Sequence, residues 1–317
     1  AGPPMIIRVG AGRRSLRIVA FLRRIILVNR ALFLGAIHTS GGNLLARLFS
    51  VIAALYAASS LTPSGFGEFS FMLSTAGLAS GVGLLGLGTI ITREAARRED
   101  RLEALASAAF ILAGLTTLIA AAGVCLAINA FDLAPTVTGF PGWVAIVSVW
   151  SLSLTCNTVL SALLTGRRKF ATAAQVTVAR GFAVAFAMAV GAFSGSALAT
   201  SLYVCLAEAT IFVVLFTVLA WRWRPDMRVD GVHVRRRVLL LLRVGLRAGA
   251  AAIAVQTSFW GVQAILVAQP YGTSMLGALA LAQRIVIVIT LIPAGLSAAS
   301  LPLLSGNGTD RPSLRVA

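Results

Sequence analysis

Acidic residues are scarce in this sequence: its 317 residues include 10 Asp and Glu against 27 Lys and Arg, and only 12% are charged. A soluble domain usually has about a quarter of its residues charged. Cysteine and histidine are also few, and none of them has the spacing of a metal site or a disulfide framework. Paired carboxylates and phosphate-binding loops are missing as well. The sequence therefore predicts no enzyme, no bound metal and no cofactor.

Apolar residues dominate instead. They make up 58% of the chain, the mean hydropathy is +0.91, and apolar runs long enough to cross a bilayer recur along the whole length. The runs do not alternate with period two, which argues against a β-barrel. We predict an all-α polytopic membrane protein. Its eight expected spans lie near residues 35–60, 68–92, 104–129, 142–165, 171–193, 198–221, 244–269 and 274–300.

The basic residues are distributed on one side of these spans. Of the 27, 24 lie in the segments predicted to face one side, and the four linkers of the other side contain none. This asymmetry follows the positive-inside rule and predicts a cytoplasmic N-terminus. The net charge of +17 then indicates contact with anionic membrane lipids rather than nucleic acid. The three remaining basic residues, Arg47, Arg180 and Arg284, lie inside predicted spans.

The longest polar linker between spans divides the chain. Two spans follow it and repeat the helix, Pro/Gly turn and helix pattern of the first two, as in some alternating-access transporters. A polar sequence follows the eighth span, so we expect the second lobe to be incomplete. Within the first segment, residues 5–30 are expected to form an amphipathic interfacial helix, the alternative being a misassigned start or a partial leader. The predicted segments are 1–34 (basic, cytoplasmic), 35–221 (six-helix lobe), 222–243 (basic linker), 244–303 (partial second lobe) and 304–317 (polar tail).

Four ionisable residues are expected at similar depths in the membrane: Arg47, Arg180, Glu208 and Arg284. Each would cost roughly 2.5 to 3.5 kcal/mol facing lipid, so they should face a cavity or one another. Their shared depth suggests one site with an excess of positive charge. A guanidinium matches the geometry of phosphate, which makes a diphosphate the natural ligand. The alternative for Arg180 is a purely structural pair with Glu208.

Polar side chains at helical spacing extend this candidate site. Asn43 shares a helix face with Arg47, Asn157 lies in a Ser/Thr stripe, and Gln256 and Gln263 share a face with a tryptophan. These amides could donate hydrogen bonds to a polar ligand. The stripe around Asn157 could equally only hold helices together. The small-residue pattern of Gly77 and Gly81 in "STAGLASGVGLLGLG" predicts close helix packing.

Several loose motifs occur in a recognisable order: "ARLFSVIAALYAASSLTPSGFGEFSF", "GLLGLGTIITREAARRE", "LTGRRKFATAAQVTVAR" and "YGTSMLGALALAQRIVIVITLIPAGLSAASLPLL". Over residues 35–304 the chain resembles the polysaccharide-transport branch of the MOP/MATE exporter superfamily, the Wzx-type flippases. The resemblance implies two lobes around a cationic cavity in the bacterial inner membrane, with Arg47 and Arg284 on the cavity wall. It also implies flipping of undecaprenyl-diphosphate-linked oligosaccharide for O-antigen, capsule or exopolysaccharide, alongside polymerase or assembly proteins as partners. Family members have 12 to 14 spans, so this chain is expected to be truncated.

Three other functions stay open on the sequence alone. A multidrug exporter of the same superfamily fits less well, because organic cations favour membrane carboxylates and Glu208 is the single one expected at mid-membrane. An integral-membrane glycosyltransferase or polymerase usually has large outer loops, and the longest here contains only Asp132 as a charged residue. The third is a non-transporting scaffold for polysaccharide assembly.

Overall fold

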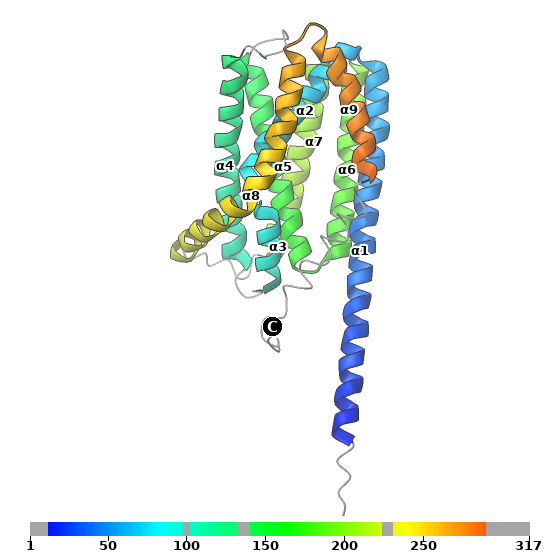
Figure 1. The fold of residues 1–317 in the computed structure, drawn as a ribbon, viewed down its shortest axis with the longest axis vertical. Helices are drawn as coiled ribbons and strands as arrows, with labels where there is room; N and C mark the ends of the chain where they lie inside the picture. The colour runs from blue at the N-terminus through cyan, green and yellow to red at the C-terminus, as the bar shows by residue number, and fades with distance from the viewer. Residues whose placement is uncertain (1–11, 98–101, 132, 134–139, 224–230, 290–317) are drawn as a thin grey trace, which may run out of the picture.

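A computed structural model describes residues 12–97, 102–131, 133, 140–223 and 231–289, and these residues form a bundle of α-helices without β-strands (Figure 1). The all-α prediction is confirmed. The helices are α1 (Gly12–Ser60), α2 (Pro63–Leu84), α3 (Leu87–Arg97), α4 (Leu102–Ala130), α5 (Phe140–Gly166), α6 (Phe170–Phe193), α7 (Ala197–Trp223), α8 (Gly231–Val267) and α9 (Gly272–Ile289).

Most of the predicted spans have a counterpart among these helices. Six segments are long and apolar enough to cross a membrane, and α2 with α3 makes a seventh if this bent pair counts as one span. The eighth predicted span begins as α9, and its last residues lie outside the described part of the chain. The six segments are Ile37–Ser60, Glu103–Ala130, Gly142–Gly166, Phe170–Phe193, Ala197–Val218 and Arg237–Val267.

The second span differs from its prediction, because it starts earlier and is broken. It starts at Pro63, where Thr62 caps the helix by accepting a hydrogen bond from the backbone N–H of Gly65 (3.1 Å). It then breaks between α2 and α3 with a bend of 46°. Leu85 and Gly86 have positive φ values of 47° and 69°, so both are left-handed. Glycine adopts this conformation without a steric penalty, which explains a break at this point.

The glycines of α2 are used differently from the prediction. A Cβ added to Gly77 would meet no heavy atom within 4 Å, whereas the nearest atoms to one added to Gly81 would be in the side chain of Gln256, at 3.3 Å. The expected close packing is therefore wrong for Gly77, and at Gly81 it involves a side chain rather than the backbone of a neighbouring helix. Gly83, two residues after Gly81, lies against the backbone of Thr117 in α4 instead. The close helix approach occurs there.

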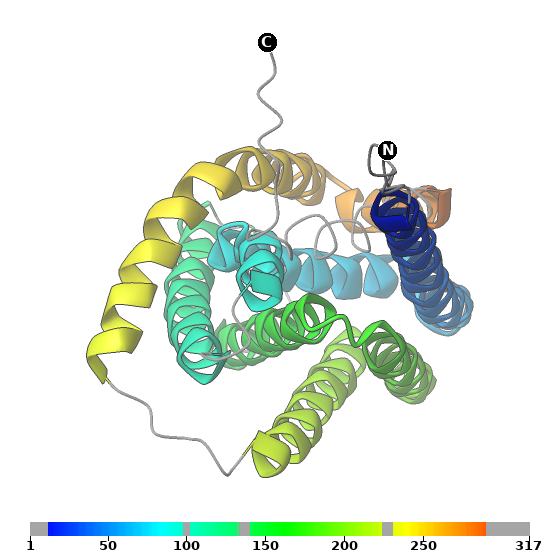
Figure 2. The same cartoon turned by 90° about the horizontal axis from the view of Figure 1, so that it is seen from below.

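Helix α2 runs through the middle of the bundle (Figure 2). It packs against α4, α5 and α7 on one side and against α8 and α9 on the other. Its largest buried neighbours include Trp150 of α5, whose ring lies 6.3 Å from that of Phe69. Around this centre, α1 packs along α6, and α6 packs along α7. Polar residues on α2 are therefore enclosed by helices from both predicted lobes.

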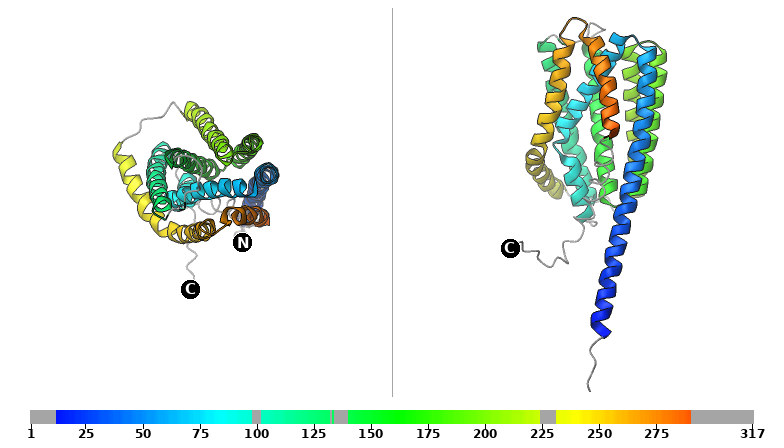
Figure 3. Two further views of the ribbon diagram at one scale, coloured as in Figure 1. Left: turned by 90° about the horizontal axis from the view of Figure 1, so that it is seen from above. Right: turned by 45° about the vertical axis from the view of Figure 1, so that its right-hand side comes forward.

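Helix α1 is much longer than a membrane span. It has 49 residues, so its length is roughly 70 Å, and its first half projects beyond the other helices (Figures 1 and 3). The sequence predicted a separate interfacial helix over residues 5–30. Residues 12–30 are helical as expected, but they continue directly into the first span, and residues 1–11 lie outside the described part.

Candidate functional site

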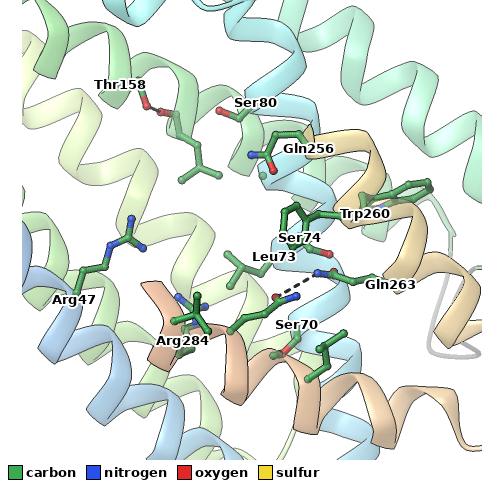
Figure 4. Close-up of a pocket in the computed structure, with 17 residues that line it drawn as sticks. Arg47, Ser70, Leu73, Ser74, Ser80, Thr158, Gln256, Trp260, Gln263 and Arg284 are labelled. Atoms are coloured by element: carbon green, nitrogen blue, oxygen red, sulfur yellow. Dashed lines mark hydrogen bonds between the residues drawn. The ribbon is translucent and has the colours of Figure 1, made fainter. Parts of the chain in front are cut away.

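A cavity of about 880 Å³ lies between α1, α2, α5, α8 and α9 (Figure 4). Its wall combines two arginines with a series of amides, hydroxyls and aromatic rings. None of the lining residues, all of which the structure describes, is acidic. The lining residues are Arg47, Ser70, Leu73, Ser74, Gly77, Ser80, Leu154, Thr158, Gln256, Phe259, Trp260, Gln263, Leu279, Ala280, Gln283, Arg284 and Val286.

The two arginines come from helices that are far apart in sequence. Arg47 lies in α1 and Arg284 in α9, and Figure 4 shows both on the same side of the cavity. Arg284 donates a hydrogen bond from Nη1 to Oγ of Ser50, 3.1 Å away. Both guanidinium groups are cations on the wall of one cavity, so they repel each other. This side of the cavity therefore presents concentrated positive charge that an anion would neutralise.

Amide and hydroxyl groups lie on the α2 and α8 side. Gln263 is 7% exposed, and its Nε2 makes a long hydrogen bond of 3.5 Å to Oε1 of Gln283. The Oε1 atom of Gln263 is buried and has no hydrogen-bond partner among the described residues. A buried acceptor without a partner is unfavourable unless a ligand or water satisfies it. Gln263 is thus suited to receive a hydrogen bond from a hydroxyl group in the cavity.

Trp260 has a fixed orientation at the edge of this polar surface. Its Nε1 donates to Oγ1 of Thr75 in α2 at 3.0 Å. Its ring also stacks on Phe71, with centroids 6.1 Å apart and an interplanar angle of 23°. Two contacts on different atoms hold the indole against α2 while another part of the side chain lines the cavity.

The other two ionisable residues expected at mid-membrane form a separate cluster. Arg180 makes two hydrogen bonds to the carboxylate of Glu208, from Nε to Oε2 (2.7 Å) and from Nη2 to Oε1 (2.8 Å). Asn157 donates from Nδ2 to the same Oε2 at 2.8 Å. The structure does not place these three residues on the cavity wall. Glu208 is 4% exposed, and a carboxylate that deeply buried requires a cation beside it. The alternative in which Glu208 neutralises Arg180 is the geometry observed.

Asn43 also lies off the cavity wall. It is half-buried in α1, one helical turn before Arg47. Of the predicted site residues, the structure brings Arg47, Arg284, Gln256 and Gln263 together and leaves Asn43, Asn157, Arg180 and Glu208 outside the lining.

Sequence reasoning missed five polar residues of the cavity wall. Ser70, Ser74 and Ser80 follow one another along α2, and Thr158 and Gln283 come from α5 and α9. A signal existed for α2, because Ser70, Ser74 and Gly77 are spaced by four and three residues and so share a face. That face was interpreted as helix packing because it also contains glycine.

A comparison with protein-family profiles shows which family the chain belongs to. The sequence profile of the Polysaccharide biosynthesis protein family matches residues 16–307, which is most of the chain. The chain belongs to this family. A search of curated protein sequences found no match.

Solved structures show that this family member has the fold of MATE transporters. It matches the MATE multidrug transporter DinF-BH with a TM-score of 0.66 and 15% identity over 88% of this chain and 65% of that one. An outward-facing MATE family transporter of the MOP superfamily gives a TM-score of 0.59 at 15% identity, again over 88% and 65%.

A third match is a MOP superfamily transporter from Pyrococcus furiosus, whose binding pocket is described as having reverse polarity. It has a TM-score of 0.53 and 14% identity over 88% of this chain and 65% of that one. The chain thus spans about 65% of the length of the structures that it matches. Identities at this level establish the fold only.

Proposed function

We propose that the chain acts in flipping a polyprenyl-diphosphate-linked oligosaccharide across the bacterial inner membrane for cell-surface polysaccharide synthesis. The observation that carries the proposal is the pair Arg47 and Arg284 in a cavity whose lining contains no acidic residue. Membership of the polysaccharide biosynthesis family and the MATE-like fold support it. In this proposal the diphosphate is the group that the arginines bind.

The depth of the two arginines fits a headgroup that crosses the membrane. Arg47 lies 13 residues before the end of α1 at Ser60, and Arg284 lies 12 residues after the start of α9 at Gly272. At 1.5 Å per residue, both are roughly 20 Å from the end of the bundle where these helix ends lie. A phosphate group at that depth has left the lipid headgroup layer, and only charged partners can offset its desolvation.

The wall opposite the arginines suits the sugar. Gln256, Gln263 and the α2 serines offer donors and acceptors, and Trp260 offers an apolar ring face. Carbohydrates present both hydroxyls and apolar C–H surface, so such a mixed wall complements them. The apolar chain would remain in lipid while the headgroup occupies the cavity, and movement of α8 and α9 against the first seven helices would expose the headgroup to the other side.

A multidrug exporter remains the other candidate because solved multidrug transporters share the fold. The charge of the cavity argues against it. An organic cation would meet two guanidinium groups and no carboxylate on the cavity wall, and like charges in a partly desolvated site repel strongly.

Native mass spectrometry of the chain purified with its host lipids tests the proposal. We expect a bound polyprenyl-diphosphate saccharide on the wild type and its loss from both Arg47→Ala and Arg284→Ala. Arg93→Ala is the matched control, since Arg93 is exposed on α3 and does not line the cavity. Retention of the ligand by both cavity variants, or its absence from the folded wild type, would overturn the proposal.

A further inference from the structure

The four ionisable residues expected at mid-membrane, Arg47, Arg180, Glu208 and Arg284, form a row across four helices. Glu208 of α7 binds Arg180 of α6, Arg180 lies at the contact between α6 and α1 next to Arg47, and Arg47 lines the same cavity as Arg284 of α9. The two ends of the row differ. One end is a buried carboxylate, and the other is the cationic wall of the cavity.

The seam between α1 and α6 brings the middle of this row together. A Cβ added to Gly181 would lie 2.5 Å from the Cβ of Ala46, so the two helices touch at this level. Arg180 directly precedes Gly181, and Arg47 directly follows Ala46. The backbones of the two arginines therefore lie next to this close contact between α1 and α6, although only Arg47 lines the cavity.

The carboxylate of Glu208 has one further partner besides Arg180, the amide of Asn157. The Nδ2 atom of Asn157 donates to its Oε2 at 2.8 Å and also to the backbone oxygen of Glu208 at 3.2 Å. Both Asn157 and Glu208 are buried, at 3% and 4% exposure, whereas the side chain of Arg180 is 26% exposed. The arginine is thus the least enclosed member of the cluster, and its long side chain is the one that can change position.

We propose that Glu208 is a positioning residue that binds Arg180 while no substrate is present and releases it to bind the substrate diphosphate. We call Arg180 the reserve arginine. In the empty cavity Glu208 binds Arg180, so that only two unpaired guanidinium groups face each other. When a diphosphate enters, its non-bridging oxygens can accept charge-assisted hydrogen bonds beyond those of Arg47 and Arg284, and Arg180 turns from Glu208 toward it. This inference rests on the proposed function, because it assumes a diphosphate ligand.

The pairing of Arg180 with Glu208 would also help the substrate to leave the cavity. A transported anion must bind well enough to enter and weakly enough to leave. Because Glu208 and the diphosphate compete for Arg180, the affinity of the site for the diphosphate is lowered by a fixed amount. When the ligand leaves, Arg180 binds Glu208 again. A site with three permanently free arginines would bind more tightly and release more slowly.

Two variants and one probe test the inference. Farnesyl diphosphate, which has the diphosphate and a prenyl chain but no sugar, is titrated calorimetrically into the full chain in phosphatidylcholine nanodiscs. Glu208→Gln removes the charge that competes for Arg180. We expect its affinity for farnesyl diphosphate to be on the order of tenfold higher than that of wild type, which corresponds to one added charge-assisted hydrogen bond. In Arg180→Gln/Glu208→Gln both charges are gone, and we expect affinity on the order of tenfold lower than wild type, because the reserve arginine is missing.

A purely structural pair gives a different result. It would leave the affinity of both folded variants at the wild-type value, and that outcome overturns the inference. The double variant leaves no unpaired charge between α6 and α7, so it decides the question if Glu208→Gln alone does not fold. A wild-type chain that does not bind farnesyl diphosphate would contradict the proposed function itself, whereas normal wild-type binding with unchanged variants contradicts only the reserve arginine.

Discussion

Arg284 of α9 and Ser50 of α1 are joined by a hydrogen bond of 3.1 Å between residues that are 234 positions apart in the sequence. Ser50 lies three residues after Arg47, so one turn of α1 provides both an arginine and the anchor for the other arginine. The bond restrains the Arg284 side chain beside the cavity. An anion that binds both arginines then loses less side-chain entropy than it would with two freely moving side chains.

The first prediction concerns this anchor. Ser50→Ala should weaken the binding of farnesyl diphosphate by several-fold, because it removes a hydrogen bond worth about 0.5 to 1.5 kcal/mol that orients the Arg284 side chain. The midpoint of thermal unfolding should change little, since Ser50 is only partly buried. Titration calorimetry measures the affinity. Ser258→Ala is the control, because Ser258 is exposed and bonds only to Ala254 of its own helix. Equal affinities for Ser50→Ala and the control would contradict the role of the anchor.

The second prediction separates packing glycines from cavity glycines in α2. Gly83→Ala should destabilise the protein by about 1 to 3 kcal/mol, because its methyl group would overlap the backbone of Thr117 in α4. Gly77→Ala adds the same methyl group in the same helix where no atom lies within 4 Å, and should be neutral or slightly stabilising. Thermal unfolding in detergent compares the two. Equal midpoints would show that α2 and α4 do not approach closely at Gly83.

The third prediction concerns the break between α2 and α3. Gly86 has a φ of 69°, so Gly86→Ala should lower the free energy of unfolding by about 1 kcal/mol or more through backbone strain. Crowding by Gly249 of α8 adds to this, since a Cβ would lie 3.1 Å from its Cα. Gly88→Ala, two residues later and in open space within α3, should be neutral or stabilising. The unfolding midpoints of the two variants are compared directly, and a midpoint for Gly86→Ala as high as that of Gly88→Ala would refute the strained break.

The long apolar runs predicted the helices far better than their interruptions. Runs of apolar residues require backbone hydrogen bonds to close within each segment, so the spans could be placed from hydropathy alone. The break at Leu85 and Gly86 could not, because "GLLGLG" gives no indication of which glycine takes a positive φ. That choice depends on Gly245 and Gly249 of α8, which lie more than 150 positions away and pack against Leu85.

The candidate site was predicted in part for a related reason. An arginine within a span indicates that it has a partner or faces a cavity, but the sequence does not distinguish the two. Arg47 and Arg284 line the cavity, whereas Arg180 has the same depth and binds Glu208. The difference follows from which helix lies opposite. Helix α6 faces the carboxylate of α7, while α1 and α9 face the cavity between α2 and α8.

The fourth prediction concerns the contact between Trp260 and Thr75. Thr75→Val should destabilise by about 1 to 3 kcal/mol, because it leaves the indole N–H without its acceptor. Trp260→Phe removes the donor, so Thr75→Val should cost less in that background. A double-mutant cycle on unfolding free energies should give a coupling of about 0.5 to 1.5 kcal/mol. Additive effects would mean that the hydrogen bond does not hold α8 to α2.

The fifth prediction assigns Gln263 to the saccharide rather than to the diphosphate. Gln263→Leu removes a buried acceptor that has no partner together with the long 3.5 Å bond to Gln283, so the stability should stay close to that of wild type. Binding of farnesyl diphosphate should not change, since the arginines remain. Binding of a polyprenyl-diphosphate saccharide should weaken by about tenfold, the cost of one lost hydrogen bond to a sugar hydroxyl in a buried site. Titration of both ligands into wild type and variant measures the difference. An equal loss for both ligands would place Gln263 with the arginines, and no loss for either would remove it from the site.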